Sequence, residues 1–177
     1  VYGIHITGGM DKNSIITFCK EKGIKLIIDA AHPFAENLHK NIALASSELQ
    51  IPVVRYERNY PEHSEDILWF DSYGEAIDYL EKNSIDNLLA LTGVNTISKL
   101  KPYWEKHNCW FRILDREESR QIVQKQGFLI DRIIYYRQGE DEAPLYKNLN
   151  PQAIITKESG DSGGFKEKIE AAKELNI

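Results

Sequence analysis

The stretch IKLIIDAAHPFAENLHKNIALASSELQIPVVRYE, residues 24–57, decides the fold. It opens with a continuous apolar run of strand length, residues 24–29, and closes with a second one, residues 51–57. Between them Pro33 suits a first helical position, and apolar residues then recur at helical spacing, namely Phe34, Leu38, Ile42, Ala45 and Leu49. Apolar strands interleaved with helices predict an α/β fold with mainly parallel sheets, covered by helices on both faces.

The same alternation extends outward from this stretch. A helix upstream, with Ile15, Phe18 and Cys19 at helical spacing, is expected to stop at Gly23. Downstream, Ser72 and Glu75 have capping-box spacing at a helix start. Further helices are expected over 95–106, 116–125 and from 163 onward, and strands over 87–93, 110–114, 131–137 and 153–156. The polar segment 59–66 predicts a crossover between two lobes, 1–62 and 63–177.

Composition limits the kinds of function. The 177 residues are 42% hydrophobic, which allows a substantial core, and the net charge of −5 gives no reason to expect nucleic acid. Cys19 and Cys109 lack the spacing of a disulfide framework or a metal site. No apolar run reaches the length of a membrane helix and no signal segment opens the chain, so a cytoplasmic protein is expected. The start at Val1 and the strand-like ending ELNI suggest a fragment.

The string GDSGG, residues 160–164, is the one that surrounds the nucleophilic serine of chymotrypsin-like proteases, and His32 precedes it in the right order. A protease of that class is antiparallel, whereas Ser162 here lies between an expected buried strand and a helix. The G-x-S-x-G frame of a nucleophile elbow also fits, but no histidine follows it. A serine hydrolase acting through Ser162 therefore stays a remote alternative.

Ligands of open parallel sheets bind where strands end, so the turns after strands are informative. After the first strand, Asp29 and His32 flank a helix start and can bind an anion or donate a proton; taken alone, the turn favours Asp29 as a cap. Arg55 and Arg58 can clamp carboxylates or phosphates, or belong with Glu57 to a surface cluster, and the sequence leaves these two readings equal.

Two further turns offer backbone and hydroxyl groups. Thr92 and Gly93 end a strand where backbone can approach a ligand, although simple turn chemistry explains them equally well. The segment TKESGDSGGFKEK, residues 156–168, places a lysine, two serines and three glycines before a helix N-terminus. That density of donors favours an anion such as phosphate over a plain glycine turn capped by serine.

Together these turns resemble those of a known family, the precorrin-6A and cobalt-precorrin-6A reductases of cobalamin biosynthesis. Residues 29–58, DAAHPFAENLHKNIALASSELQIPVVRYER, are similar to that family's D-A-T-H-P-F-A block, alanine-rich helix and R-x-E-R strand end. Residues 155–172, ITKESGDSGGFKEKIEAA, are similar to its T-K-x-S-G-x-x-G-G block. LTGVN, residues 91–95, fits the threonine-glycine strand end between them.

The resemblance implies two Rossmann-like lobes with NADPH and an anionic tetrapyrrole in the cleft between them, and hydride transfer to a macrocycle double bond that gives precorrin-6B. It implies substrate binding by Asp29, His32, Pro33, Phe34, Arg55 and Arg58, with His32 as a candidate proton donor. It implies cofactor or anion binding by Thr92, Gly93, Thr156, Lys157, Ser159, Gly160, Gly163, Gly164 and Lys168. No metal, nucleic acid, membrane or obligate protein partner is expected; a non-catalytic binding module for an acidic metabolite is the alternative.

The chain also departs from the family pattern. The family's opening strand and Gly-Gly-Thr nucleotide turn have no counterpart here, so the first strand-turn-helix of the first lobe is expected to be missing, as is the last strand of the second. Gly139, Glu140 and Asp141 stand where the family has Gly-Pro-Phe. A piece of this length alone is therefore expected to bind NADPH poorly and to show little activity.

Overall fold

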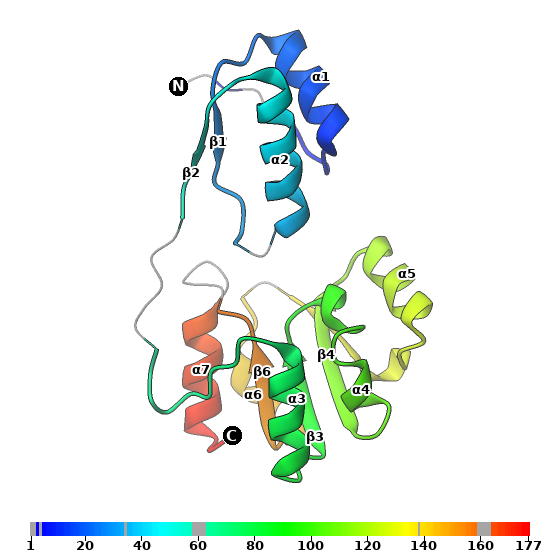
Figure 1. Ribbon diagram of the computed structural model, residues 1–177. Coiled ribbons are helices and arrows are strands. Elements are labelled where there is room, and N and C mark those ends of the chain that lie inside the picture. The colour runs from blue at the N-terminus through cyan, green and yellow to red at the C-terminus, as the bar shows by residue number, and fades with distance from the viewer. Residues whose placement is uncertain (1–2, 4, 34, 58–62, 138, 159–163) are drawn as a thin grey trace. The chain divides into compact units, whose positions relative to one another are not determined.

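The computed structural model of the chain describes residues 3, 5–33, 35–57, 63–137, 139–158 and 164–177. The chain divides into two compact units, Val1–Asn59 and Tyr60–Ile177 (Figure 1). Each unit is an α/β structure in which every strand pair of the described residues is parallel.

The first unit contains α1 (Lys12–Lys22), β1 (Ile27–Asp29), α2 (Glu36–Leu49) and β2 (Val53–Arg55). The strands pair in parallel, with Asp29 opposite Arg55. Both helices pack on one face of these strands (Figure 1), in a core that holds Ile15, Ile42 and Ala45. α1 begins after Asp11, whose carboxylate accepts the Ser14 N–H at 2.8 Å, and ends at Gly23 in the left-handed region, which confirms the predicted stop.

Three predictions for this unit are wrong in detail. The strands are shorter than the apolar runs that contain them, and they are not buried throughout: Ile28 is 66% exposed and Val54 52% exposed, because α1 and α2 cover one face only. Pro33 does not occupy a first helical position. It lies in a turn that the Ala35 N–H closes by donating to the His32 carbonyl at 2.8 Å, and α2 begins after that turn.

The second unit is built on four parallel strands in the order β5-β4-β3-β6. The strands are β3 (Asn87–Leu91), β4 (Asn108–Leu114), β5 (Ile133–Tyr136) and β6 (Ala153–Thr156). The helices are α3 (Tyr73–Lys82), α4 (Lys101–Trp104), α5 (Glu117–Gln126), α6 (Glu142–Leu149) and α7 (Phe165–Glu174), with short 3-10 turns η1 (Val94–Thr96) and η2 (Ile130–Arg132).

Alternate residues of β3 face two separate cores. Leu88 and Ala90 pack with residues of α3, α4 and α5, whereas Leu89 and Leu91 pack with residues of α6 and α7. Helices therefore cover both faces of this sheet, and β3 is buried on both sides as its unbroken apolar run predicts. The predicted α/β class with parallel sheets is confirmed.

Some helices of this unit were predicted correctly from capping residues and apolar spacing, and others were not. Ser72 caps α3 by accepting the Glu75 N–H at 3.2 Å, as predicted. The helix expected over 95–106 is instead η1 followed by the short α4, because Pro102 cannot donate the backbone hydrogen bond that a continuous helix would need. α6 was not predicted, although Asp141 caps it by accepting the Ala143 N–H at 3.2 Å. Among the described residues, no helix has both the length and the apolar character needed to cross a membrane.

Candidate functional site

The carboxyl ends of β1 and β2 bring Asp29 and Arg55 side by side. The Tyr56 N–H donates to the Asp29 carbonyl at 2.9 Å and continues the strand pairing. Arg55 Nε contacts Glu57 Oε1 at 2.8 Å on the surface, which is one pair of the surface cluster considered above. Both partners are well exposed, and water competes for this pair, which leaves the Arg55 guanidinium able to exchange Glu57 for a ligand carboxylate.

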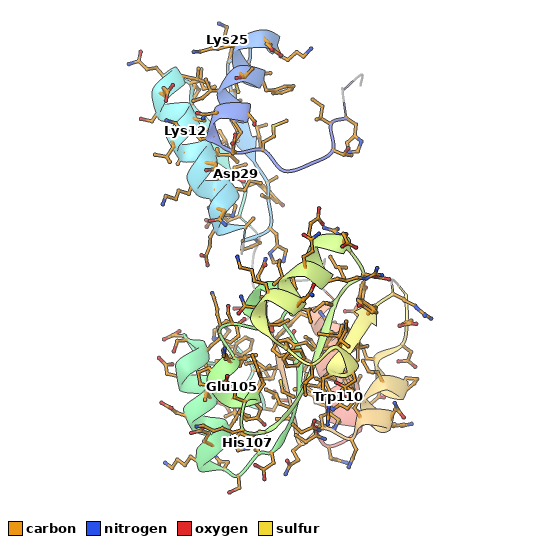
Figure 2. The ribbon with its side chains drawn as sticks, turned by 90° about the vertical axis from the view of Figure 1, so that its right-hand side faces the viewer. Lys12, Lys25, Asp29, Glu105, His107 and Trp110 are labelled. Atoms are coloured by element: carbon orange, nitrogen blue, oxygen red, sulfur yellow. The ribbon has the colours of Figure 1, made fainter. Side chains whose placement is uncertain are left out.

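Asp29, which is labelled in Figure 2, is buried and holds two hydrogen bonds. Its Oδ1 accepts the Ala31 N–H at 3.2 Å, and its Oδ2 lies 2.7 Å from Nδ1 of His39 in the first turn of α2. Burial raises the pKa of Asp29, but the hydrogen bonds from His39 and Ala31 outweigh it, and the pKa lies below its ordinary value. The carboxylate is therefore ionised and fixed in place. It does not cap α2, whose first turn follows Ala35.

The structure thus gathers most of the residues predicted in the first unit. Asp29, His32 and Pro33 share the turn between β1 and α2, and Arg55 ends the neighbouring strand. Phe34 and Arg58 lie outside the described residues. Sequence reasoning missed His39, whose only signal was its place two helical turns after His32.

In the second unit, the register of β3 and β6 joins two predicted turns. Leu91 pairs with Thr156, so Thr92 and Lys157 follow adjacent strand ends. Thr96 Oγ1 donates to the Gly93 carbonyl at 2.7 Å, and Thr92 Oγ1, 2.6 Å from Thr96 Oγ1, then donates to it. Gly93 has φ 83° and ψ 169°, a conformation that glycine alone adopts readily.

Tyr73, the first residue of α3, adds a hydroxyl to this network. Burial raises the pKa of Tyr73, and hydrogen bonds with Thr92 and Thr96 only partly oppose that effect. The Lys99 ammonium lies 5.5 Å from the centre of the Tyr73 ring. Hydroxyls and a cation therefore surround the end of β3.

The end of β6 carries a buried hydroxyl, and α7 contributes a partly buried lysine to the same unit. Thr156 Oγ1 is buried and has no hydrogen-bond partner among the described residues, which is costly unless a ligand or water supplies one. Lys168 lies in α7, whose N-cap is Gly164 in the left-handed region. Burial lowers the pKa of Lys168, and the Arg112 charge lowers it further. Ser159, Gly160, Ser162 and Gly163 lie outside the described residues.

Arg112 and Glu142 form a buried ion pair that sequence reasoning missed. Arg112 Nη1 and Nη2 contact the two Glu142 carboxylate oxygens at 2.5 and 2.7 Å, and both side chains are about nine-tenths buried. The signal was a charged residue inside the apolar strand 110–114, since a buried arginine needs a partner. The charges of both partners act on Lys168, as does that of Glu167, so two cations and two anions influence one another in this part of the second unit.

These arrangements can bind anions. Lys157 directly follows Thr156, whose buried hydroxyl has no partner among the described residues, and Lys168 adds a cation near Arg112 and Glu142 in the second unit. Arg55 supplies a bidentate donor beside the Asp29 turn in the first unit. The geometry suits carboxylates and phosphates at both places.

Comparison with known proteins identifies the family. Residues 2–177 match the family model of precorrin-6x reductase CbiJ/CobK. The chain is 34% identical to a cobalt-precorrin-6A reductase of Priestia megaterium over 96% of this chain and 69% of the relative. It is 31% identical to one of Methanocaldococcus jannaschii over 96% and 68% of the two chains.

A solved structure of CobK precorrin-6A reductase has the same fold, with a TM-score of 0.73 at 18% identity, and the match covers 98% of this chain and 70% of that one. The family match includes residues 160–164, so GDSGG lies within a stretch that reductases share. The resemblance stated from the sequence is confirmed: this chain belongs to the precorrin-6x reductase CbiJ/CobK family of cobalamin biosynthesis.

Proposed function

We propose that this chain takes part in the NADPH-dependent reduction of a macrocycle double bond of precorrin-6A or cobalt-precorrin-6A to the precorrin-6B level. The observation that carries the proposal is the pair of anion-binding arrangements at the carboxyl ends of the strands, in a chain whose relatives are named cobalt-precorrin-6A reductases. We also propose that the units Val1–Asn59 and Tyr60–Ile177 correspond to two Rossmann-like lobes.

The residues of the second unit fit a nicotinamide dinucleotide phosphate. The buried Thr156 hydroxyl, which has no hydrogen-bond partner in the part of the chain that the structure describes, and the lysines Lys157 and Lys168 are donors suited to phosphate oxygens. Gly93, which follows the neighbouring strand, has open space where a side chain would stand and lets backbone approach a ligand. When bound, the cofactor supplies the hydride.

The residues of the first unit fit the acidic substrate. Arg55 can bind an acetate or propionate carboxylate of the tetrapyrrole by exchanging its exposed Glu57 partner. Asp29 is ionised and holds the turn that carries His32. Reduction of the double bond needs a proton besides the hydride, and the His32 imidazole is the candidate donor on this turn.

The test is anaerobic incubation of the chain with NADPH and each of the two substrates. Slow consumption of NADPH, in line with the little activity expected of a piece of this length, with gain of two hydrogens by the macrocycle is the expected result, and deuterium is transferred when the cofactor hydride is labelled. NADPH binding is measured separately by fluorescence titration. Tight binding of the tetrapyrrole without any NADPH binding or consumption would replace the reductase proposal with a binding module for an acidic metabolite.

A further inference from the structure

His39 has both ring nitrogens placed against oxygen acceptors. Nδ1 lies 2.7 Å from Asp29 Oδ2, and Nε2 lies 3.0 Å from the His32 carbonyl oxygen. A carbonyl oxygen carries no hydrogen, so Nε2 must donate. The other oxygen of Asp29 accepts the Ala31 N–H and Arg55 stands opposite Asp29 on the neighbouring strand, surroundings that favour the carboxylate, so the hydrogen of the short contact is assigned to Nδ1. The ring therefore donates from both nitrogens and forms an ion pair with Asp29.

This ion pair is shielded from water. The His39 side chain is 12% exposed and that of Asp29 is 4% exposed. The other charged side chain that acts on Asp29 is Arg55 from the neighbouring strand, which has its own partner in Glu57. The contact with His39 is thus the short, buried one that fixes the carboxylate.

The contacts of His39 connect the start of α2 with the end of β1 and with the turn between these two elements. Asp29 ends β1, His32 lies in the turn, and His39 belongs to α2. The N-cap residue of this helix is Ala35, which has no side-chain oxygen to fix the helix start. The backbone contributes the Ala35 N–H to His32 carbonyl bond, but that bond lies wholly within the turn. The His39 ring therefore supplies the side-chain anchor that a cap would otherwise provide.

We propose that His39 is a positioning residue: its doubly donating ring locks the turn between Asp29 and Ala35 so that His32 and Pro33 are presented to the ligand in one conformation. This inference rests on the proposed function only in treating the turn as one that binds the substrate. The lock itself is a property of the free chain.

The first measurement reads the ring directly. In NMR spectra of the full chain with isotope-labelled histidine, at neutral pH, His39 should show two nitrogen signals of the N–H type, assigned by their loss in His39→Gln. A His39 ring with a single hydrogen would overturn the proposal. Because the spectrum is recorded on the unmodified chain, the answer does not depend on whether a variant folds.

The second measurement is the rate of amide hydrogen exchange in the turn. Loss of a hydrogen bond to a charged group should speed amide hydrogen exchange at Ala31 and Ala35 by about 10- to 100-fold in His39→Ala. The Ile24 amide, which donates to Cys19 at the other end of the unit, should not change. An unchanged rate at Ala31 and Ala35, or an equal increase at Ile24, would mean that His39 has no positioning role.

The matched control is His107→Gln in the second unit; His107 is labelled in Figure 2, and its Nδ1 contacts Asp86 at 2.8 Å. That substitution should leave the turn and tetrapyrrole binding unchanged, whereas His39→Gln should weaken tetrapyrrole binding without changing NADPH binding. If the unmodified chain binds no tetrapyrrole but shows both ring signals and the local exchange effect, the proposed function fails and the lock stands.

Discussion

Replacing Glu142 with glutamine should destabilise the second unit strongly. The substitution preserves shape but removes the anion that both Arg112 Nη atoms contact at 2.5 and 2.7 Å. The Arg112 guanidinium would stay buried near Lys168, a second cation that already has a lowered pKa because of burial and the Arg112 charge. Breaking a buried ion pair from one side costs about 3–5 kcal/mol. For a unit of this size, that loss lowers Tm by on the order of 10–20 °C.

Tryptophan fluorescence provides the assay, because the chain's three tryptophans, Trp69, Trp104 and Trp110, all belong to the second unit. Urea titrations of this signal should show a lower midpoint for Glu142→Gln with an unchanged slope. The control is Glu81→Gln, which removes an exposed pair with Lys106 at 2.8 Å and should shift the midpoint far less.

A double variant distinguishes the lost partner from damaged packing. Arg112→Met combined with Glu142→Leu removes both charges together, and such replacements of buried pairs are often neutral or stabilising. The double variant should therefore be more stable than Glu142→Gln alone. The reasoning is refuted if Glu142→Gln costs less than about 1 kcal/mol, the range of exposed pairs, or if the double variant is as unstable as the single one.

Three other predictions concern the candidate site. Gly93→Ala should lower the free energy of unfolding, measured by urea titration, by about 1–3 kcal/mol. The loss comes from backbone strain alone, since nothing lies within 4 Å of the added methyl group. The control Gly74→Ala, inside α3 at a negative φ, should not destabilise the unit. The first unit should lose stability as the pH falls below the unfolded Asp29 pKa of 3.8 and through the lower folded one, followed by the NMR signals of the core residue Ala45, and Asp29→Asn should reduce that dependence to the part that Asp11 and Glu48 contribute. Lys168 has a folded pKa below its unfolded 10.5, so its contribution to the stability of the second unit should rise with pH between the two values, and Lys168→Met should remove that contribution when denaturation curves of the two chains are compared at each pH.

Short apolar runs of strand length and apolar residues at helical spacing determined most of the fold. Apolar runs at 24–29, 87–93 and 153–156 contain β1, β3 and β6, and the glycines 23 and 127 end α1 and α5 in the left-handed region. These features are local, because a cap or a strand run acts within a few residues. α6 was not predicted because its eight residues give too short an apolar pattern. The exposure of β2 was not predicted because no local feature of the sequence tells whether a second layer covers a strand.

The candidate site needed tertiary structure to be assembled. The sequence identified Asp29, Thr92 and Thr156 as strand ends, but only the pairing of β3 with β6 joined Thr92 to a turn more than sixty residues away. Likewise, the partners of the two buried charges, His39 for Asp29 and Glu142 for Arg112, come from helices that pack against the strand ends. Strand order and helix packing decide such contacts, since a buried charge is paired by whichever element the fold places beside it and not by its neighbours in sequence.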